Sequence, residues 1–403
     1  MRILLLNLYY PPDTSATAKM AQTVVDALSA AHQVTIVCGR PSYQPTARRP
    51  WYWWQIERVT GSPAVKIVRV GSTDYSRTQM KRRVLNYLTY VALSVPRAMA
   101  EPCDVVLGMT DPPFEGIVAA LVAMLKGRPF VYNIRDLYPD MAVGGSIVEP
   151  GLLTRVWEKL HRWALRRATR VIVLGDDMRA RILAKGVKAE RVVVVRDGVE
   201  SGSVRPAPEV DETIVRAIRG GFRFVLLHAG NLGFYGAWEI LVAAGRRLAD
   251  EGVGLVFVGD GAQRERIAAA AAGCTNIRFL PFFPAGKIES VLAAPDAHVV
   301  TVKRGLEGVI VPSKMYGILA AGKAIVAVAP RETDVASIGE KRGFAVWGDP
   351  ENDAQVADAI RGISRDAAQL RQMGEAARAA ASDYDRVSEL RKFVGIVEEA
   401  RTA

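Results

Sequence analysis

The chain has 403 residues, of which 50% are hydrophobic and 24% charged, and this composition excludes a disordered, collagen-like or coiled-coil protein. Its length favours two domains with separate cores and a functional site between them. Of the net charge of +11, residues 1–205 contribute +12 (29 lysines and arginines against 17 aspartates and glutamates) and the remainder −1 (24 against 25). A one-sided basic surface attracts polyanions such as nucleic acid or an anionic membrane.

Hydropathy, the first residues and the cysteines bear on location. No apolar run reaches the roughly 18–20 residues that cross a bilayer, so we expect no membrane span. The apolar run Ile3–Leu6 has no small-residue cleavage site after it, which indicates a first strand and not a signal peptide. Cys38, Cys103 and Cys274 lack metal-ligand spacing and fit a reducing compartment. We therefore expect a cytoplasmic protein.

Short apolar runs alternate with helical stretches along the whole chain. Runs of four to six residues that are apolar on both faces are typical of buried parallel strands, and their alternation with helices predicts βαβ units. The pattern predicts an α/β protein with two doubly wound, Rossmann-like domains in tandem. The expected strands are Arg2–Leu8, Gln33–Cys38, Val65–Val70, Asp104–Met109, Pro129–Ile134, Arg170–Leu174, Arg191–Val195, Phe222–His228, Gly254–Val258, Asn276–Pro281, His298–Val302, Ala324–Val328 and Gly343–Trp347.

Two segments of the basic half combine charge with apolar bulk. Trp51, Trp53 and Trp54 follow a pair of arginines, which is the composition of an interfacial anchor. The usual RNA-binding signatures are missing. The segment therefore favours an anionic membrane surface as partner over nucleic acid.

The second segment begins with Lys81, Arg82 and Arg83 and continues as an apolar helix. A buried helix with a basic first turn is one interpretation. Cations at a helix N-terminus oppose the helix dipole, however, so a compensating anion such as an anionic membrane is expected.

Residues 198–211 contain glycine, serine and two prolines without hydrophobic periodicity. We place a linker at 201–211, between an N-terminal domain of residues 1–200 and a C-terminal domain of residues 212–382. A last helix within 383–403 follows the final strand and could pack on either domain.

Three glycine-bearing segments follow strand ends in the C-terminal half. Glycines at such a turn let the backbone approach a phosphate, and the next helix presents its N–H groups. One turn alone could merely permit a tight connection. Because parallel strands end at one edge of a sheet, three turns favour a nucleotide site. The predicted binding residues are Gly230, Asn231, Gly233, Gly259, Asp260, Gly261 and Gly308.

The segment 305–323 is the strongest local signal. Pro312 suits a first helical turn and Gly322 a C-terminal cap, which predicts one helix that carries Ser313 and Lys314 toward the nucleotide. A lysine and a hydroxyl suit a diphosphate, although Lys314 could instead be a solvated surface charge. Glu307 could accept hydrogen bonds from sugar hydroxyls or be an ordinary loop carboxylate.

The order of these segments resembles GT-B-fold glycosyltransferases of family 4, and among them the bacterial branch that builds O-antigen or capsular polysaccharide, including fucosamine-type transferases. The resemblance covers nearly the whole chain. It implies two Rossmann-like domains that face a cleft. The first binds the acceptor and is also the domain whose basic segments predict membrane association, and the second binds a nucleotide-diphosphate sugar. The motifs that carry it are Tyr9–Pro12, Arg135–Asp140, Asp197–Val199, Ala229–Gly233, Gly259–Gly261 and Pro312–Lys323.

The chain departs from the family pattern at charged positions. The usual pair of glutamates corresponds to Val309 and Gly317, and the usual Arg and Lys of the donor site correspond to Asn231 and Gly236. Other cations must then neutralise the diphosphate. The substitutes that the resemblance implies are Lys314 with Lys303 or Arg304, together with the hydroxyl of Ser15 in an altered first loop.

The resemblance also implies the chemistry. Members retain anomeric configuration through an oxocarbenium-like transition state, and the departing diphosphate helps to deprotonate the acceptor, so positioning and charge stabilisation matter most. Asp136, just past a strand end, is the candidate for orienting the acceptor hydroxyl, with a helix cap as its alternative role. The predicted catalytic residues are thus Asp136, Glu307 and Lys314. Asp383 and Asp385 match an Asp-x-Asp metal motif but lie at a helix start, so we expect a cap, no metal and no cofactor besides the donor.

These features predict a peripheral enzyme of the inner membrane face. It would move a sugar from a nucleotide sugar, expected to be a UDP-sugar, to a polyprenyl-diphosphate-linked glycan in surface polysaccharide synthesis. Two alternatives remain. One is a UDP-sugar 2-epimerase of the same fold, and the other is a non-catalytic membrane-associated partner protein, which the missing glutamates suggest.

Overall fold

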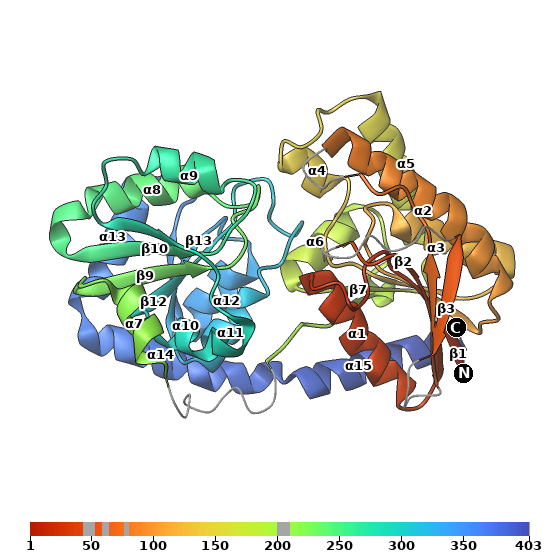
Figure 1. Ribbon diagram of the computed structural model, residues 1–403. Helices are drawn as coiled ribbons and strands as arrows, with labels where there is room; N and C mark the ends of the chain where they lie inside the picture. The colour runs from red at the N-terminus through yellow and green to blue at the C-terminus, as the bar shows by residue number, and fades with distance from the viewer. Residues whose placement is uncertain (43–52, 59–63, 76–79, 200–209, 403) are drawn as a thin grey trace.

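The computed structural model describes residues 1–42, 53–58, 64–75, 80–199 and 210–402. Two α/β domains lie side by side, each with helices on both faces of its sheet (Figure 1). The predicted fold class of two doubly wound domains is confirmed. In the described residues, no helix has the length and hydropathy that a bilayer crossing requires.

The N-terminal sheet has the strand order β3-β4-β2-β1-β5-β6-β7-β8 and is parallel except for the edge strand β3, which runs antiparallel to β4. Its strands are β1 (Arg2–Leu6), β2 (Gln33–Gly39), β3 (Trp54–Arg58), β4 (Val65–Val70), β5 (Val105–Gly108), β6 (Phe130–Asn133), β7 (Arg170–Val173) and β8 (Val192–Val194). Its helices are α1 (Ala16–Ser29), α2 (Met80–Ala100), α3 (Glu115–Lys126), α4 (Asp140–Gly144), α5 (Leu152–Arg167) and α6 (Asp176–Ala184).

The C-terminal sheet is parallel throughout, with the order β11-β10-β9-β12-β13-β14. Its strands are β9 (Phe224–Ala229), β10 (Val253–Val258), β11 (Ile277–Leu280), β12 (Ala297–Thr301), β13 (Ala324–Val328) and β14 (Ala345–Gly348). Its helices are α7 (Glu212–Arg219), α8 (Trp238–Arg247), α9 (Arg264–Ala270), α10 (Ile288–Ala293), α11 (Lys314–Ala320), α12 (Asp334–Arg342), α13 (Asp353–Arg365) and α14 (Ala367–Ala381).

Every apolar run that the sequence predicts as a strand coincides with a strand of the structure. Strands such as β5, β6 and β10 are buried along their whole length, because helices cover both sheet faces. Among the described strands, β3 alone was missed. Its first residue, Trp54, is the last residue of the aromatic segment at 51–54, which was interpreted as an interfacial anchor.

The last helix, α15 (Arg386–Glu399), returns to the N-terminal domain and runs beneath it in Figure 1. Phe393 and Val397 are buried in the core that also holds β1 and β2. Asp385 caps α15 by accepting a hydrogen bond from the Ser388 N–H at 2.8 Å, as predicted for this motif. Most of the expected linker at 201–211 lies outside the described residues.

Candidate active site

Both sheets reverse their strand order in the middle, between β1 and β5 and between β9 and β12. Ligands of open α/β sheets bind outside the carboxyl ends of the strands at such a reversal. The loops that follow β6 and β12 meet across the two domains. Asp136 forms an antiparallel bridge with Ile310, and the Leu137 N–H donates to the Val309 carbonyl at 2.9 Å.

On the C-terminal side, Lys314 and the turn after β9 come together. The Lys314 Nζ lies 3.2 Å from His228 Nε2 and 5.7 Å from the centre of the Tyr235 ring. A Cβ placed on Gly230 would lie 3.3 Å from the same Nζ. The first residue of α11 therefore reaches the glycine turn, where the sequence predicts a diphosphate site.

The charges at this point depend strongly on burial. Burial lowers the pKa of Lys314 to about 7. Burial, and then the positive charge of Lys314, lower the pKa of His228 well below its usual value. His228 is therefore neutral at pH 7, while the ammonium of Lys314 is only partly retained, and a bound anion would stabilise its charged form.

The turns after β9 and β10 pack directly on each other. A Cβ on Gly259 would lie 2.0 Å from the Gly230 carbonyl oxygen, and one on Gly261 would lie 2.5 Å from Asn231 Oδ1. The Leu232 N–H donates to the Asp260 carbonyl at 2.9 Å. The glycines thus have a packing role, which agrees with the alternative interpretation of the glycines as permitting a tight connection.

On the N-terminal side, Asp136 is a half-buried carboxylic acid at the bridge to Ile310. Burial, and then the negative charge of Asp111, raise its pKa to about 6, while Arg135 opposes the shift. A carboxylate with this pKa can accept a proton near neutral pH. Its alternative role as a helix cap is wrong, because Pro139 occupies the N-cap of α4.

Sequence reasoning missed Asp111 and the contact of Arg83 with the loop after β1. Asp111 follows β5 at the reversal of strand order, and burial raises its pKa against a hydrogen bond from Thr17. Arg83 donates from Nη2 to the Tyr9 hydroxyl at 3.1 Å, so it reaches the loop after β1. The strand end before Asp111 was a usable signal, whereas nothing local indicated the direction of Arg83.

Residues 15–198 match the family model of a glycosyl transferase 4-like domain. The chain is 26% identical over 377 residues to WcaI of Escherichia coli (strain K12), whose name assigns it to colanic acid biosynthesis as a glycosyl transferase. This alignment covers 90% of the chain and 91% of WcaI. The chain is a GT-B glycosyltransferase with a family 4-like domain.

Solved structures agree with this fold for the glycosyltransferase. A sucrose-phosphate synthase from Thermosynechococcus elongatus superposes with a TM-score of 0.75 at 16% identity, covering 99% of this chain and 98% of that one. Anabaena Alr3699/HepE in complex with UDP-glucose superposes with a TM-score of 0.69 at 18% identity, covering 100% of both chains. The likeness extends over both domains.

The other residues predicted for the donor site differ in their contacts. Lys303 is half-buried, and its backbone N–H donates to the Tyr235 carbonyl at 2.7 Å. Arg304 points elsewhere and pairs with Asp349 at 3.1 Å and with Glu351 at 2.6 Å. Ser313 is exposed at the start of α11 and does not cap it with its hydroxyl. Of the three predicted substitute cations, Lys314 is the one that contacts the glycine turn.

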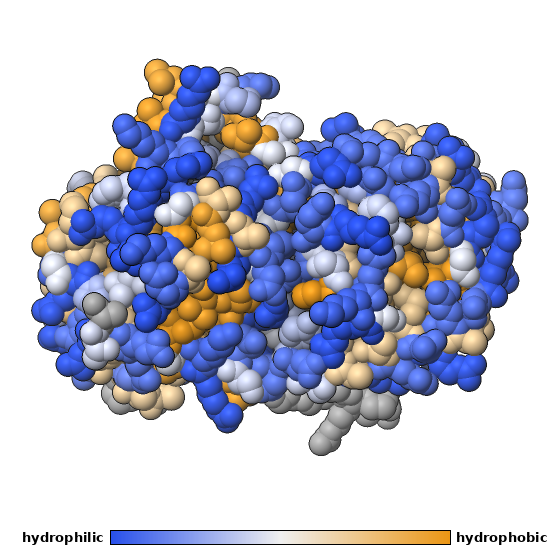
Figure 2. All heavy atoms as spheres, turned by 180° about the vertical axis from the view of Figure 1, so that it is seen from behind, coloured by the Kyte–Doolittle hydropathy of each residue, from blue (hydrophilic) through white to orange (hydrophobic). Residues whose placement is uncertain are grey.

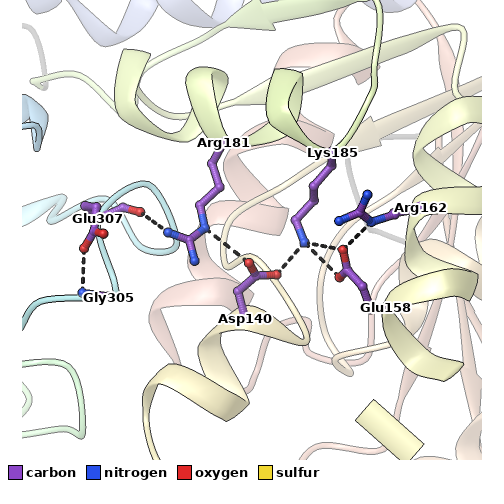
Figure 3. A network of polar contacts seen from close by, with 7 residues as sticks. All are labelled: Asp140, Glu158, Arg162, Arg181, Lys185, Gly305 and Glu307. Carbon is purple, nitrogen blue, oxygen red and sulfur yellow. Dashed lines mark hydrogen bonds and ion pairs between the residues drawn. The ribbon is translucent and has the colours of Figure 1, made fainter. Parts of the chain in front are cut away.

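The loop after β12 is fastened to α6 of the N-terminal domain (Figure 3). Glu307 accepts a hydrogen bond from the Gly305 N–H at 2.7 Å, and its carbonyl accepts one from Arg181 at 3.0 Å. A Cβ on Gly308 would lie 2.4 Å from the Asp177 carbonyl oxygen. The Glu307 carboxylate is therefore bonded within its own loop, and Gly308 lies at the contact between the domains.

A cavity of about 780 Å³ lies beside this loop, between the two domains. Its wall carries a chain of ion pairs in which Lys185 contacts Asp140 at 2.7 Å and Glu158 at 2.8 Å (Figure 3). Arg181 completes the chain, contacting Asp140 at 3.2 Å. Burial alone would raise the pKa of Asp140, but Lys185 and Arg181 outweigh it and lower that pKa.

Ser15 is buried at the N-cap of α1, where its Oγ accepts from the Ala18 N–H at 3.1 Å. The hydroxyl thus caps the helix that follows β1. Of the expected membrane contacts, Trp53 and Trp54 are exposed at the edge strand β3, whereas Trp51 and the Lys81 side chain lie outside the described residues. Arg82 is exposed and lies 5.6 Å from the centre of the Tyr75 ring.

Proposed function

We propose that this glycosyltransferase moves a sugar from a UDP-sugar to a lipid-linked glycan in surface polysaccharide synthesis, with retention of anomeric configuration. The observation that carries the proposal is the meeting of Lys314 with the glycine turn after β9, opposite Asp136 of the other domain. The name of WcaI and the UDP-glucose bound to Alr3699/HepE support the substrate classes.

On the donor side, the diphosphate lies against Lys314 and the turn at Gly230. An incoming anion restores the full charge of Lys314, whose pKa burial has lowered to about 7. This charge then stabilises the negative charge that develops on the departing diphosphate. The proposal assigns this neutralisation to the protein and involves no further cofactor.

On the acceptor side, Asp136 orients the hydroxyl that attacks the sugar. The pKa of about 6 leaves it mostly ionised at pH 7 and able to accept a hydrogen bond from that hydroxyl. The negative charge of Asp111 is one of the causes of this raised pKa. Glu307 supports the reaction by holding the loop after β12, since its carboxylate bonds the Gly305 N–H.

The N-terminal domain has a surface suited to lipid. Three neighbouring helices expose large apolar side chains, and Figure 2 shows hydrophobic side chains gathered at the top of this domain, where α5 begins. Apolar residues beside arginines favour peripheral binding to an anionic inner membrane face. We call this set the apolar face; it consists of Val84, Leu85 and Leu88 of α2, Leu121, Met124 and Leu125 of α3, and Leu152, Leu153, Val156 and Leu160 of α5.

The test is acceptor-dependent release of UDP from a panel of UDP-sugars in the presence of a bacterial lipid extract. We expect release with one sugar, and its loss in Lys314→Met. Lys188→Met is the matched control, because the Lys188 side chain is 72% exposed and pairs only loosely, at 3.9 Å, with Glu190. Saturable binding of UDP should accompany turnover.

Two outcomes would contradict the proposal. A changed sugar in a UDP-sugar incubation without acceptor would indicate an epimerase. Normal UDP binding without turnover on any acceptor lipid would indicate a non-catalytic partner protein.

A further inference from the structure

Arg83 turns inward from the apolar face. Its neighbours Val84, Leu85 and Leu88 are 47%, 45% and 52% exposed, whereas Arg83 is half-buried. Its Nη2 donates to the Tyr9 hydroxyl at 3.1 Å, and its guanidinium lies 5.3 Å from the centre of the Tyr87 ring. A cation thus lies between a lipid-suited surface and the loop after β1.

From this cation a row of half-buried aromatic rings leads toward Asp136. Tyr87 meets Phe114 edge-on with ring centres 6.1 Å apart, and Phe114 meets Trp157 at 6.5 Å. Trp157 in turn stacks on Tyr138 at 5.9 Å, two residues from Asp136 in the chain. The indole N–H of Trp157 is buried and has no hydrogen-bond partner within the described part of the chain.

We propose that Arg83 binds the phosphate that joins lipid to sugar in the acceptor. This inference rests on the proposed function and adds a subsite to it. The acceptor has the order lipid, phosphate, sugar, and the protein has the same order from the apolar face through Arg83 and the aromatic rings to Asp136. Sugars pack their C–H faces on aromatic rings, and a guanidinium forms paired hydrogen bonds with phosphate oxygens.

The charges around Arg83 are compatible with a phosphate. Asp111 is a carboxyl group that interacts with Arg83: burial raises its pKa, while Thr17 and the charges of Arg83 and Arg135 lower it. The charge of Arg83 also opposes the rise in the pKa of Tyr138, the last ring of the row.

The experiment measures binding of farnesyl diphosphate by calorimetry with the donor site saturated by UDP. Arg83→Gln should weaken this binding by about tenfold or more, because a charge-assisted hydrogen-bond donor is lost. Arg167→Gln is the matched control, and we expect an effect within about twofold because Arg167 is exposed at the end of α5. Arg83→Lys should recover part of the affinity, since it keeps the charge without the paired geometry.

A second arm separates the acceptor phosphate from a membrane headgroup. Arg83→Gln should sediment with phosphatidylglycerol vesicles as the wild type does, because the apolar face is unchanged. Unchanged farnesyl diphosphate binding in Arg83→Gln would overturn the proposal, as would loss of vesicle binding alone. UDP binding is measured in every variant, so a misfolded variant or a failure of the transferase proposal shows itself as lost UDP binding.

Discussion

Lys314 experiences two opposing effects. Burial beside neutral His228 and the Tyr235 ring disfavours its charge, yet its position at the glycine turn suits a diphosphate. With a pKa of about 7, the amine is half-protonated at neutral pH before any ligand binds. Donor binding at this lysine should therefore take up a proton.

The affinity for UDP should consequently fall as the pH rises above 7. Binding raises the pKa of Lys314, and between the free and bound values the association constant falls by about tenfold per pH unit. Calorimetry from pH 7 to 9 measures this slope in the wild type. Lys314→Arg should bind UDP with little pH dependence in that range. A wild-type affinity for UDP that does not change between pH 7 and pH 9 would contradict the assignment.

Residue types at the site could be predicted from sequence, but only some of their contacts could. Lys314 and Gly230 were expected at the same edge of the sheet, because their segments both follow strand ends. The structure brings them together. Arg304 has the same kind of position, but its partners Asp349 and Glu351 come from the turn after β14. Gly308 was assigned to the ligand because a loop sequence cannot show which domain its backbone will touch.

At the scale of elements, the turns after β9 and β10 act as one unit. Gly259 has a φ of +144° and would place a Cβ 2.0 Å from the Gly230 carbonyl oxygen. Neither the backbone conformation nor the space admits a side chain. The shape of the donor turn therefore depends on a glycine in the neighbouring turn.

Gly259→Ala should separate these turns and weaken UDP binding. The strained backbone should also lower the free energy of unfolding by about 1–3 kcal/mol. Gly362→Ala serves as control, since no atom lies within 4 Å of its added Cβ in α13, and it should stabilise by up to about 1 kcal/mol. Urea unfolding and calorimetry measure the two effects, and wild-type UDP affinity in Gly259→Ala would refute the coupling.

The buried strands were predictable because their signal is local. Runs such as β10 are apolar on both faces and end at glycine, so pattern alone marks them. The edge strand β3 has the sequence Trp-Gln-Ile-Glu-Arg and exposes Trp54 and Ile56. Its pairing with β4 is set by the neighbouring strand and not by its own composition.

At the scale of the molecule, two carboxyl groups face each other across the domains. The Asp177 N–H donates to Asp334 at 3.2 Å, and the Asp334 N–H donates to Asp177 at 3.3 Å. Burial, and then the negative charge of Asp334, raise the pKa of Asp177 to about 7 from the ordinary value of 3.8. The folded protein thus keeps a proton that the unfolded chain releases, so this contact loses stability as the pH rises from about 4 to about 7.

Asp177→Asn should remove this pH dependence. Relative to the wild type, the variant should gain roughly 1–2 kcal/mol of unfolding free energy between pH 5 and pH 8, after allowance for solvent screening. Asp176→Asn is the control, because its side chain is 64% exposed and pairs with Arg196. Denaturant unfolding at several pH values measures the difference in unfolding free energy between Asp177→Asn and the wild type. A difference that stays constant with pH would contradict the prediction, because it would mean that Asp177 ionises with its ordinary pKa.

Because α15 returns to the N-terminal domain, the chain crosses between the domains twice, and the two crossings lie next to each other. Val199 and Asp385 pair in a parallel bridge, and Val199 exchanges hydrogen bonds with Tyr384 and Arg386 at 2.6 and 2.9 Å. Two covalent connections held together in this way allow torsion about a single axis and resist sliding. Separation of the domains would then be a swing that leaves the paired segments intact and widens the gap most at the side farthest from them.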